Sequence, residues 1–218
     1  MGSPVAWAVF DEQADGYDAW YDTPGGAAMF SLEVETLRPL LEGLPRPWLE
    51  VGAGSGRFGA ALGVQVGVDP ARTPLALAAR RGVAVIQGVA EQLPFPDGSC
   101  GAVIFVLALS FVADPMAALR EARRVLAPDG AVIIGEAPHA SPLGRQYRAL
   151  GAGGHPYYRN ARFFTPDELA GLLPGSGLQI DRVRSSRLER PNGSDRPSPP
   201  RAGFHPDANF VAVRARPR

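Results

Sequence analysis

The chain has 218 residues, of which 45% are hydrophobic and 20% charged, a composition typical of a soluble globular protein that buries its own core. Lys plus Arg and Asp plus Glu balance at 22 each, so the net charge gives no sign of a nucleic-acid partner. The absence of lysine excludes Schiff-base chemistry, and a single cysteine, Cys100, excludes an internal disulfide.

No segment has the pattern expected for membrane insertion or export. The first ten residues lack the basic and apolar regions of a signal peptide. The longest apolar stretch, residues 102–112, is about half as long as a membrane span. We therefore expect a cytoplasmic protein with no membrane partner.

Strands and helices alternate along most of the chain. The near-continuous apolar run at residues 102–107 is typical of a strand buried on both faces of a parallel sheet. The expected strands cover residues 48–51, 65–68, 83–86, 102–107, 131–135, 178–183 and 210–213. The expected helices cover residues 31–44, bent or ended by Pro39, then 56–62, 73–81 and 115–126. This order predicts an α/β fold with a doubly wound, mostly parallel seven-stranded sheet, an antiparallel last strand and helices on both faces.

The length predicts a single domain over residues 1–218, with an N-terminal cap segment at about residues 1–45. Residues 140–164 lack a clear periodicity, and we interpret them as an irregular insert, a loop or a lid. Thr165 and Glu168 have the spacing of a capping box, which predicts that a helix begins there.

Residues 190–206, rich in Pro, Gly and Ser, are interpreted as a loop. If the preceding strand, residues 178–183, runs parallel to the first five, this loop emerges at the carboxyl edge of the sheet. It is then either a solvated loop without a role or a mobile flap that offers a cation to an acidic ligand. The cations in question are Arg190, Arg196 and Arg201.

A glycine-rich turn follows the first expected strand. From Glu50 to Arg57 the sequence reads Glu-Val-Gly-Ala-Gly-Ser-Gly-Arg and leads into a helix. Glycines without Cβ, together with the free N–H groups of a helix N-terminus, let a nucleotide-like ligand approach the backbone. A dinucleotide-binding fingerprint would place its third glycine at Arg57, whereas here the third glycine is Gly56. The spacing favours an adenosyl ligand without a pyrophosphate.

Asp69 ends the second expected strand, just before Pro70. A carboxylate at this place can accept hydrogen bonds from both hydroxyls of a ribose. Taken alone, Asp69 could equally be a turn residue, and we expect it outside the core. Together with the glycine turn it indicates a ribose site.

Four motifs in this order resemble those of the class I S-adenosyl-L-methionine (SAM) dependent methyltransferases, in particular the type 11-like members with small-molecule acceptors. The family pattern is E/D-x-G-x-G-x-G, an acidic strand end, A-E-x-L-P-F and R-V-L-x-P-G-G. The matching segments are residues 50–56, 68–70, 90–95 and 124–130. The resemblance extends from about residue 10 to residue 183, and it implies a Rossmann-like fold with SAM as the cofactor.

The resemblance also assigns residues to the cofactor. They are Glu50, Gly52, Ala53, Gly54, Gly56, Asp69, Pro70, Ala90, Glu91 and Leu107. It implies that the first five hold the methionine part of SAM and that Asp69 binds the ribose. Pro70 and the backbone of Ala90, with Glu91 beside it, would meet the adenine, and Leu107 would face the sulfonium.

Two positions depart from the family pattern. Val89 stands where many members carry an Asp for the adenine amino group. Cys100 and Gly101 replace an aromatic-Asp pair, and we interpret Cys100 as a small packing residue.

Methyl transfer from SAM is an in-line displacement, for which a protein mainly aligns the reactants. A base is required only if the acceptor must lose a proton. The candidates at the carboxyl edge of the sheet are Ser110, Glu136, His139 and His155, although residues of these types are more often structural. The three histidines lack close ligand spacing, so we expect no metal.

Aromatic residues occur together in two segments. Tyr17 and Tyr21 belong to a polar and aromatic N-terminal run of the kind that similar proteins place over the cofactor, although it could also staple the first helix. Tyr147, Tyr157 and Tyr158 in the insert could line an acceptor pocket or simply pack the insert. We select Tyr17, Tyr21, Ser110 and His139 as candidate substrate residues.

The leading interpretation is a methyltransferase for a small-molecule acceptor, working as a monomer or homodimer. A nucleic-acid methyltransferase is disfavoured by the neutral charge and by residues 106–109, which read Val-Leu-Ala-Leu instead of an Asn-Pro-Pro-Tyr-like motif. A non-catalytic SAM-binding accessory protein stays open, because the chemistry requires no particular side chain. A nicotinamide-dependent oxidoreductase is disfavoured by the glycine spacing.

Overall fold

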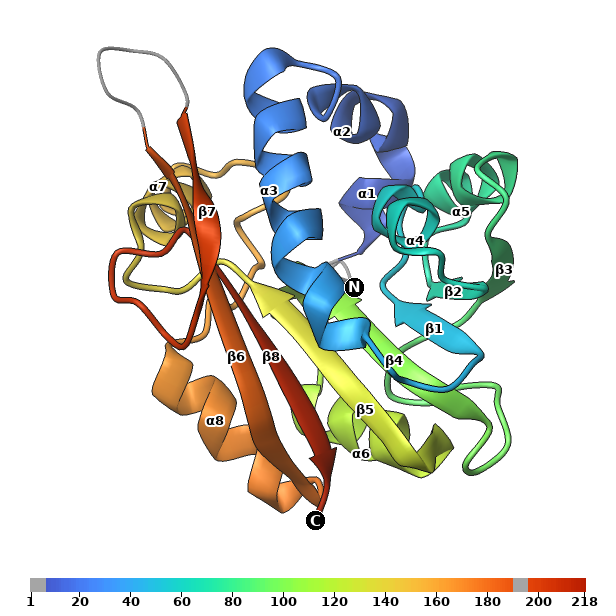
Figure 1. Cartoon of the computed structure of the whole chain (residues 1–218). Coiled ribbons are helices and arrows are strands. Elements are labelled where there is room, and N and C mark those ends of the chain that lie inside the picture. Colours follow the sequence, from blue (N-terminus) through green and yellow to red (C-terminus); the bar gives the residue numbers. More distant parts are fainter. Residues whose placement is uncertain (1–6, 190–195) are drawn as a thin grey trace.

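The computed structural model describes residues 7–189 and 196–218. In chain order the elements are α1 (Ala8–Glu12), α2 (Ala14–Trp20), α3 (Pro24–Leu41), β1 (Trp48–Val51), α4 (Arg57–Leu62), β2 (Val66–Asp69), α5 (Arg72–Arg80), β3 (Ala84–Gln87), β4 (Cys100–Val106), the 3-10 turn η1 (Leu109–Phe111), α6 (Pro115–Val125), β5 (Leu126–Glu136), α7 (Pro142–Ala152), α8 (Pro166–Gly175), β6 (Leu178–Glu189), β7 (Arg196–Ala202) and β8 (Phe210–Pro217). Figure 1 shows α3 and α4 on one face of the sheet and α6 and α8 on the other.

The strands form one sheet in the order β3-β2-β1-β4-β5-β8-β6-β7. Strands β1 to β5 are parallel, and β8 is antiparallel to both β5 and β6. Because β5 and β6 both oppose β8, β6 runs in the same direction as the first five strands. The predicted α/β class, the mostly parallel sheet and the antiparallel last strand are confirmed.

The sheet has one strand more than the sequence predicts. Residues 196–202, interpreted as part of a loop, form β7 and pair antiparallel with an extended β6. The sequence does not predict this strand, because β7 is rich in proline, which has a low strand propensity. Proline is tolerated here because β7 lies at the edge of the sheet. Arg201 contacts Asp207 at 3.4 Å, while Arg190 lies outside the described residues.

The core lies on both faces of β4, whose seven residues are all buried. Val103 and Phe105 pack on the side of α6 and α8, whereas Ile104 faces α3 and α4. This alternation follows from the two-residue period of a strand, and each large side chain buried in this way contributes roughly 1.5–3 kcal/mol. Cys100 is buried in the same core, as expected for a packing residue.

Helix α3 begins earlier than the sequence predicts and extends past Pro39 to Leu41. Thr23 caps its N-terminus by accepting a hydrogen bond from the Gly26 N–H at 3.1 Å, with Pro24 in the first turn. A Cβ on Gly26 would collide with the carbonyl of Trp20, so glycine is required where α2 and α3 meet. Because Gly25 and Gly26 carry no apolar side chain, the periodicity of the sequence does not predict this start of the helix.

The insert at residues 140–164 is not wholly irregular, because it contains α7. Ser141 caps this helix, accepting from the Gly144 N–H at 2.9 Å. A Cβ on Gly151 would lie 2.6 Å from the carbonyl oxygen of Tyr158, so the helix end and the following turn are in close approach. The capping box of α8, between Thr165 and Glu168, is present as predicted.

Within the two described stretches of chain, no helix combines the length and the apolar character needed to cross a bilayer.

We predict different costs for two alanine substitutions in the glycine turn. Gly54 has φ of 50° with open space around it, so Gly54→Ala is expected to cost only about 1–2 kcal/mol of backbone strain. Gly56 has φ of 75°, and its Cβ would lie 2.7 Å from the Cα of Ala78 on α5. Gly56→Ala is therefore expected to cost a further 1–3 kcal/mol, roughly, from overpacking. Denaturant unfolding of both variants tests this, and equal losses would contradict the close helix approach.

Candidate functional site

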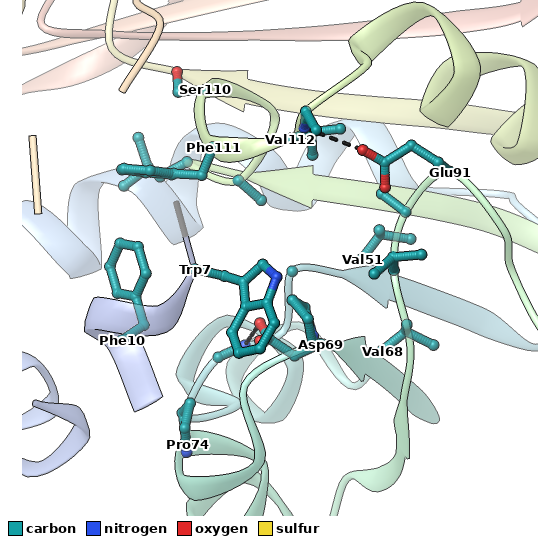
Figure 2. Close-up of a pocket in the computed structure, with 18 of the residues that line it drawn as sticks. Trp7, Phe10, Val51, Val68, Asp69, Pro74, Glu91, Ser110, Phe111 and Val112 are labelled. Carbon is teal, nitrogen blue, oxygen red and sulfur yellow. Dashed lines mark hydrogen bonds between the residues drawn. The ribbon is translucent and has the colours of Figure 1, made fainter. Parts of the chain in front are cut away.

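A cavity of about 800 Å³ lies at the carboxyl edge of the parallel strands, and we call it the larger cavity. Its walls come from the turns after β1, β2, β3 and β4, and the N-terminal helices close the opposite side (Figure 2). Of the residues assigned to a cofactor, those that line it are Gly52, Gly54, Asp69, Pro70, Ala90, Glu91 and Leu107. Glu50, Ala53 and Gly56 do not line it.

The glycine turn uses the left-handed conformation at three places, with φ of 74° at Gly52, 50° at Gly54 and 75° at Gly56. A Cβ on Gly52 would collide with the Cβ of Ala108, which follows β4. A Cβ on Gly54 would meet nothing within 4 Å, so this residue presents its backbone to open space. The turn therefore combines tight packing at its base with an accessible backbone at its tip.

Asp69 is buried, with only 8% of its surface exposed, contrary to the expectation of a residue outside the core. Its Oδ2 accepts a hydrogen bond from the Gly54 N–H and its Oδ1 one from the Ala71 N–H, both at 2.8 Å. Burial raises the pKa of Asp69 to about 6, although these two N–H groups oppose the shift. Because each carboxylate oxygen has a second lone pair, both oxygens can still accept a ribose hydroxyl.

Glu50 lies beneath the glycine turn and is 2% exposed. Its Oε2 has no hydrogen-bond partner among the described residues and would lie 2.7 Å from a Cβ on Gly59. Burial raises the pKa of this carboxyl to about 8. Its position indicates support of the turn from below.

Glu91 faces the larger cavity and also joins two of its walls. Its Oε1 accepts hydrogen bonds from the N–H groups of Ala113 at 3.0 Å and Asp114 at 3.1 Å. The segment after β3 is thereby tied to the segment after η1, as Figure 2 shows.

Leu107 is the single residue other than glycine with a positive φ, 54°, in the part of the chain that the structure describes. Its N–H donates to the carbonyl of Gly135 at 2.8 Å, which holds this conformation in place at the end of β4. Such strained backbone persists where the surroundings over-determine it, and it is concentrated at functional sites.

Several aromatic residues of the larger cavity are not apparent from the sequence motifs. Figure 2 shows the rings of Trp7 and Phe10, from the N-terminal segment, turned into the cavity. Phe10 packs edge-on against Phe111, with ring centroids 4.9 Å apart, and stacks on Tyr157 at 5.4 Å. Asn160 and Arg162 of the insert complete the rim. Only the aromatic character of the N-terminal segment hints at this role.

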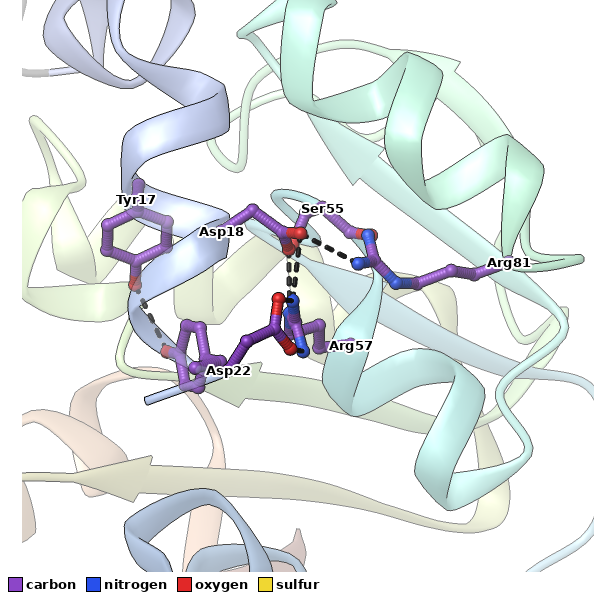
Figure 3. Close-up of polar contacts among 7 residues, drawn as sticks. Tyr17, Asp18, Asp22, Ser55, Arg57 and Arg81 are labelled. Atoms are coloured by element: carbon purple, nitrogen blue, oxygen red, sulfur yellow. Dashed lines mark hydrogen bonds and ion pairs between the residues drawn. The ribbon is translucent and has the colours of Figure 1, made fainter. Parts of the chain in front are cut away.

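An ion-pair network fastens the N-terminal helices to the glycine turn (Figure 3). Asp18 on α2 contacts Arg57 at 2.7 Å and Arg81 at 2.8 Å, and Asp22 contacts Arg57 at 2.9 Å. Burial would raise the pKa of Asp18, but hydrogen bonds from Arg57, Ser55 and Arg81 outweigh it and lower the pKa to about 2. Arg57, the residue that replaces the third glycine of a dinucleotide fingerprint, thus holds the cap segment over the cavity.

A second cavity of about 350 Å³, the smaller cavity, adjoins the larger one. The residues that line both are Phe10, Tyr17, Leu107, Ser110 and Phe111. Tyr21, Tyr147, Tyr157, Tyr158 and His155 line the smaller cavity alone. His139 lines neither of them, and its N–H donates to the carbonyl of Phe164 at 2.9 Å.

Ser110 and Glu136 meet between the two cavities. The Ser110 hydroxyl donates to Glu136 Oε2 at 2.9 Å, and the Ser110 N–H donates to Oε1 at 3.3 Å. Burial raises the pKa of Glu136 to about 7 despite these hydrogen bonds. A carboxyl with such a pKa can hold or release a proton near neutral pH.

This arrangement is typical of an α/β enzyme that binds an adenosyl ligand. Comparison with known proteins agrees, since residues 49–134 match the family model for a methyltransferase domain. The fold superimposes with a TM-score of 0.88 and 31% identity on a SAM-dependent methyltransferase of Thermotoga maritima, covering 98% of this chain and 100% of that one. That protein is described as a possible histamine N-methyltransferase.

Sequence relatives extend over most of the chain. An uncharacterised protein of Mycobacterium tuberculosis is 44% identical over 204 residues, which is 93% of this chain and 71% of that protein. Another from Methanocaldococcus jannaschii is 31% identical over 172 residues, covering 78% of this chain and 81% of that protein. The chain belongs to the SAM-dependent methyltransferases, and its cofactor is S-adenosyl-L-methionine.

The larger cavity fits this cofactor. Its volume of about 800 Å³ lies within the range of small-molecule sites, and the open space at Gly54 leaves room for a ligand against the backbone. Asp69 retains acceptor capacity for the ribose, while Leu107 lies where the larger and smaller cavities meet. When bound, SAM supplies an activated methyl group on a sulfonium.

We predict that Asp69→Asn weakens SAM binding by roughly 1.5–3 kcal/mol, the range for hydrogen bonds to a charged group. The amide replaces one acceptor oxygen by a donor, which also opposes the N–H of Gly54 or Ala71. Titration calorimetry measures the affinity, with Asp97→Asn, an exposed carboxylate, as the control. Unchanged affinity in folded Asp69→Asn would place the ribose elsewhere.

We also predict that Glu50 makes stability depend on pH. The pKa of its carboxyl is about 8 in the folded protein, compared with 4.5 for an unperturbed glutamate such as that of the unfolded chain. The folded state therefore binds the proton more tightly. The stabilisation is complete below pH 4.5 and is lost as the pH rises towards 8. Glu50→Gln cannot ionise and lacks this loss.

Denaturant unfolding at about pH 5 and about pH 9 tests this, because the variant should gain stability relative to the wild type as the pH rises. Glu35→Gln, at an exposed position, should follow the wild type. Parallel curves for Glu50→Gln and the wild type would refute the role of Glu50.

Proposed function

We propose that the protein transfers the methyl group of SAM to a small-molecule acceptor bound in the smaller cavity. The observation that carries this proposal is the position of that cavity, which shares walls at Leu107, Ser110 and Phe111 with the larger cavity. Its volume of about 350 Å³ suits a small molecule. The small-molecule acceptor suggested for the Thermotoga maritima protein supports the same acceptor class.

The residues around the smaller cavity would act mainly by orientation. All five tyrosines of the chain line it, so the acceptor is surrounded by rigid rings that restrict its position. Phe10 and Tyr17 line both cavities and would exclude water from them. The ion pair between Asp18 and Arg57 fixes the helix that carries Tyr17. Glu136, with Ser110, can hold a proton beside the acceptor.

The acceptor class is tested by incubating the protein with SAM labelled in its methyl group and a cell extract. We expect the label in the small-molecule fraction, identified by mass spectrometry. Label only in precipitated nucleic acid or protein would contradict the proposal. SAM binding without label in any fraction would favour a non-catalytic accessory protein.

We predict that Tyr147→Ala lowers methyl transfer by about 10-fold or more, since losing an aromatic wall removes packing and orientation of the acceptor. SAM affinity should stay unchanged, because Tyr147 lines only the smaller cavity. Phe204→Ala, which removes an exposed aromatic ring, is the matched control. Full transfer by Tyr147→Ala would show that the acceptor binds elsewhere.

A further inference from the structure

Glu33 is a buried carboxyl that the function described so far does not use. It comes from α3, lines the smaller cavity and is 2% exposed. Its Oε2 has no hydrogen-bond partner within the described part of the chain. A buried carboxylate without a partner is costly, so such a group indicates a donor that arrives with a ligand.

The surroundings of Glu33 are aromatic and acidic, and His155 is the one basic side chain among the described lining residues. Tyr17, Tyr21, Tyr147 and Tyr158 line the same cavity as Glu33, and burial raises the pKa of each of these tyrosines. Glu136 contributes a second carboxyl to the same cavity. None of the described lining residues is an arginine, and the chain contains no lysine. The cavity therefore has the electrostatics of a cation site with aromatic walls.

We propose that the smaller cavity binds a small primary or secondary amine, with Glu33 as the counter-ion of its ammonium group and the tyrosine rings around its carbon skeleton. The inference rests on the proposed function and names the acceptor class for it. A neutral phenol or thiol would leave Glu33 without an ionic partner, and a carboxylate would meet two carboxyl groups and no arginine among the described lining residues.

Glu33 can also accept the proton that the ammonium group must lose before methyl transfer. An ammonium nitrogen has no lone pair and must lose a proton before it can act as a nucleophile. The proton passes from this nitrogen to Glu33 Oε2, so that an N–H bond breaks, an O–H bond forms and both charges are neutralised. Burial alone raises the pKa of Glu33 to about 8, and the positive charge of an arriving ammonium lowers it again, so the bound ammonium meets a carboxylate. Once the proton has passed to Glu33, burial favours the neutral carboxyl that results.

The first test measures binding to the wild-type protein in the presence of S-adenosylhomocysteine, so that no transfer occurs. The probes are 2-phenylethylamine, 2-phenylethanol and 3-phenylpropanoate, which differ chiefly in the charge beyond a common ring. By titration calorimetry we expect the amine to bind at least about 10-fold more tightly than the alcohol, and the acid most weakly. Equal affinity for the amine and the alcohol would overturn the proposal.

The second test replaces the counter-ion. Glu33→Gln keeps the shape of the side chain and should weaken amine binding by about 10-fold or more, with unchanged affinity for 2-phenylethanol and S-adenosylhomocysteine. Glu35→Gln, an exposed glutamate on the same helix, is the matched control and should bind the amine as the wild type does. Amine binding unchanged in Glu33→Gln would overturn the proposal.

The two hypotheses fail in different ways. Methyl transfer to a phenol, thiol or acid in the labelled extract, with no methylated amine, would overturn the amine assignment and leave the small-molecule methyltransferase intact. Charge-selective binding of the amine that disappears in Glu33→Gln, with no labelled small molecule in the extract, would support the cation site and contradict the proposed function.

Discussion

Five parallel strands end at one edge of the sheet, and both cavities depend on this constraint. The turns after β1, β2 and β3 supply the glycines, Asp69 and Ala90 of the larger cavity. The ends of β4 and β5 supply Leu107 and Glu136, where the larger and smaller cavities meet. Residues far apart in the chain converge because parallel strands bring all their carboxyl ends to the same side. The catalytic architecture thus follows from strand direction before any individual side chain is considered.

Closure of the site depends on a second set of contacts, made by the N-terminal helices. Their aromatic rings cover both cavities, yet α1 and α2 are too short to be stable alone. Asp18, held between Arg57 and Arg81, ties α2 to the start of α4 and to the residue that follows α5. The glycine turn and the N-terminal helices are therefore linked, because Arg57 follows the turn directly and forms ion pairs with Asp18 and Asp22.

The smaller cavity concentrates chemistry that the fold itself does not require. Glu33 and Glu136 are buried among tyrosines, with burial raising the pKa of each. A core built for stability alone would place apolar residues there, since unpartnered buried carboxyls oppose folding. Ser110 donates hydrogen bonds to Glu136, but Glu33 Oε2 has no partner among the described residues, and the amine proposed above would supply one.

The sequence by itself determined the α/β class, the parallel strands and the capping box of α8, because local periodicity and spacing encode them. The cofactor family followed from the resemblance of four motifs to a known family. It also singled out the tyrosines of the insert, with two open roles: lining a pocket or packing the insert. It missed β7, because the prolines of this strand are tolerated only at a sheet edge. It also missed α7, because this helix contains glycines at places where a Cβ would collide with neighbouring backbone. Glu33 left a local signal, since it shares a helical stripe with Leu37 and Leu40. That this stripe opens onto a tyrosine-lined cavity, covered by Phe10, was decided only by the tertiary structure, because contacts between distant segments have no period in the sequence.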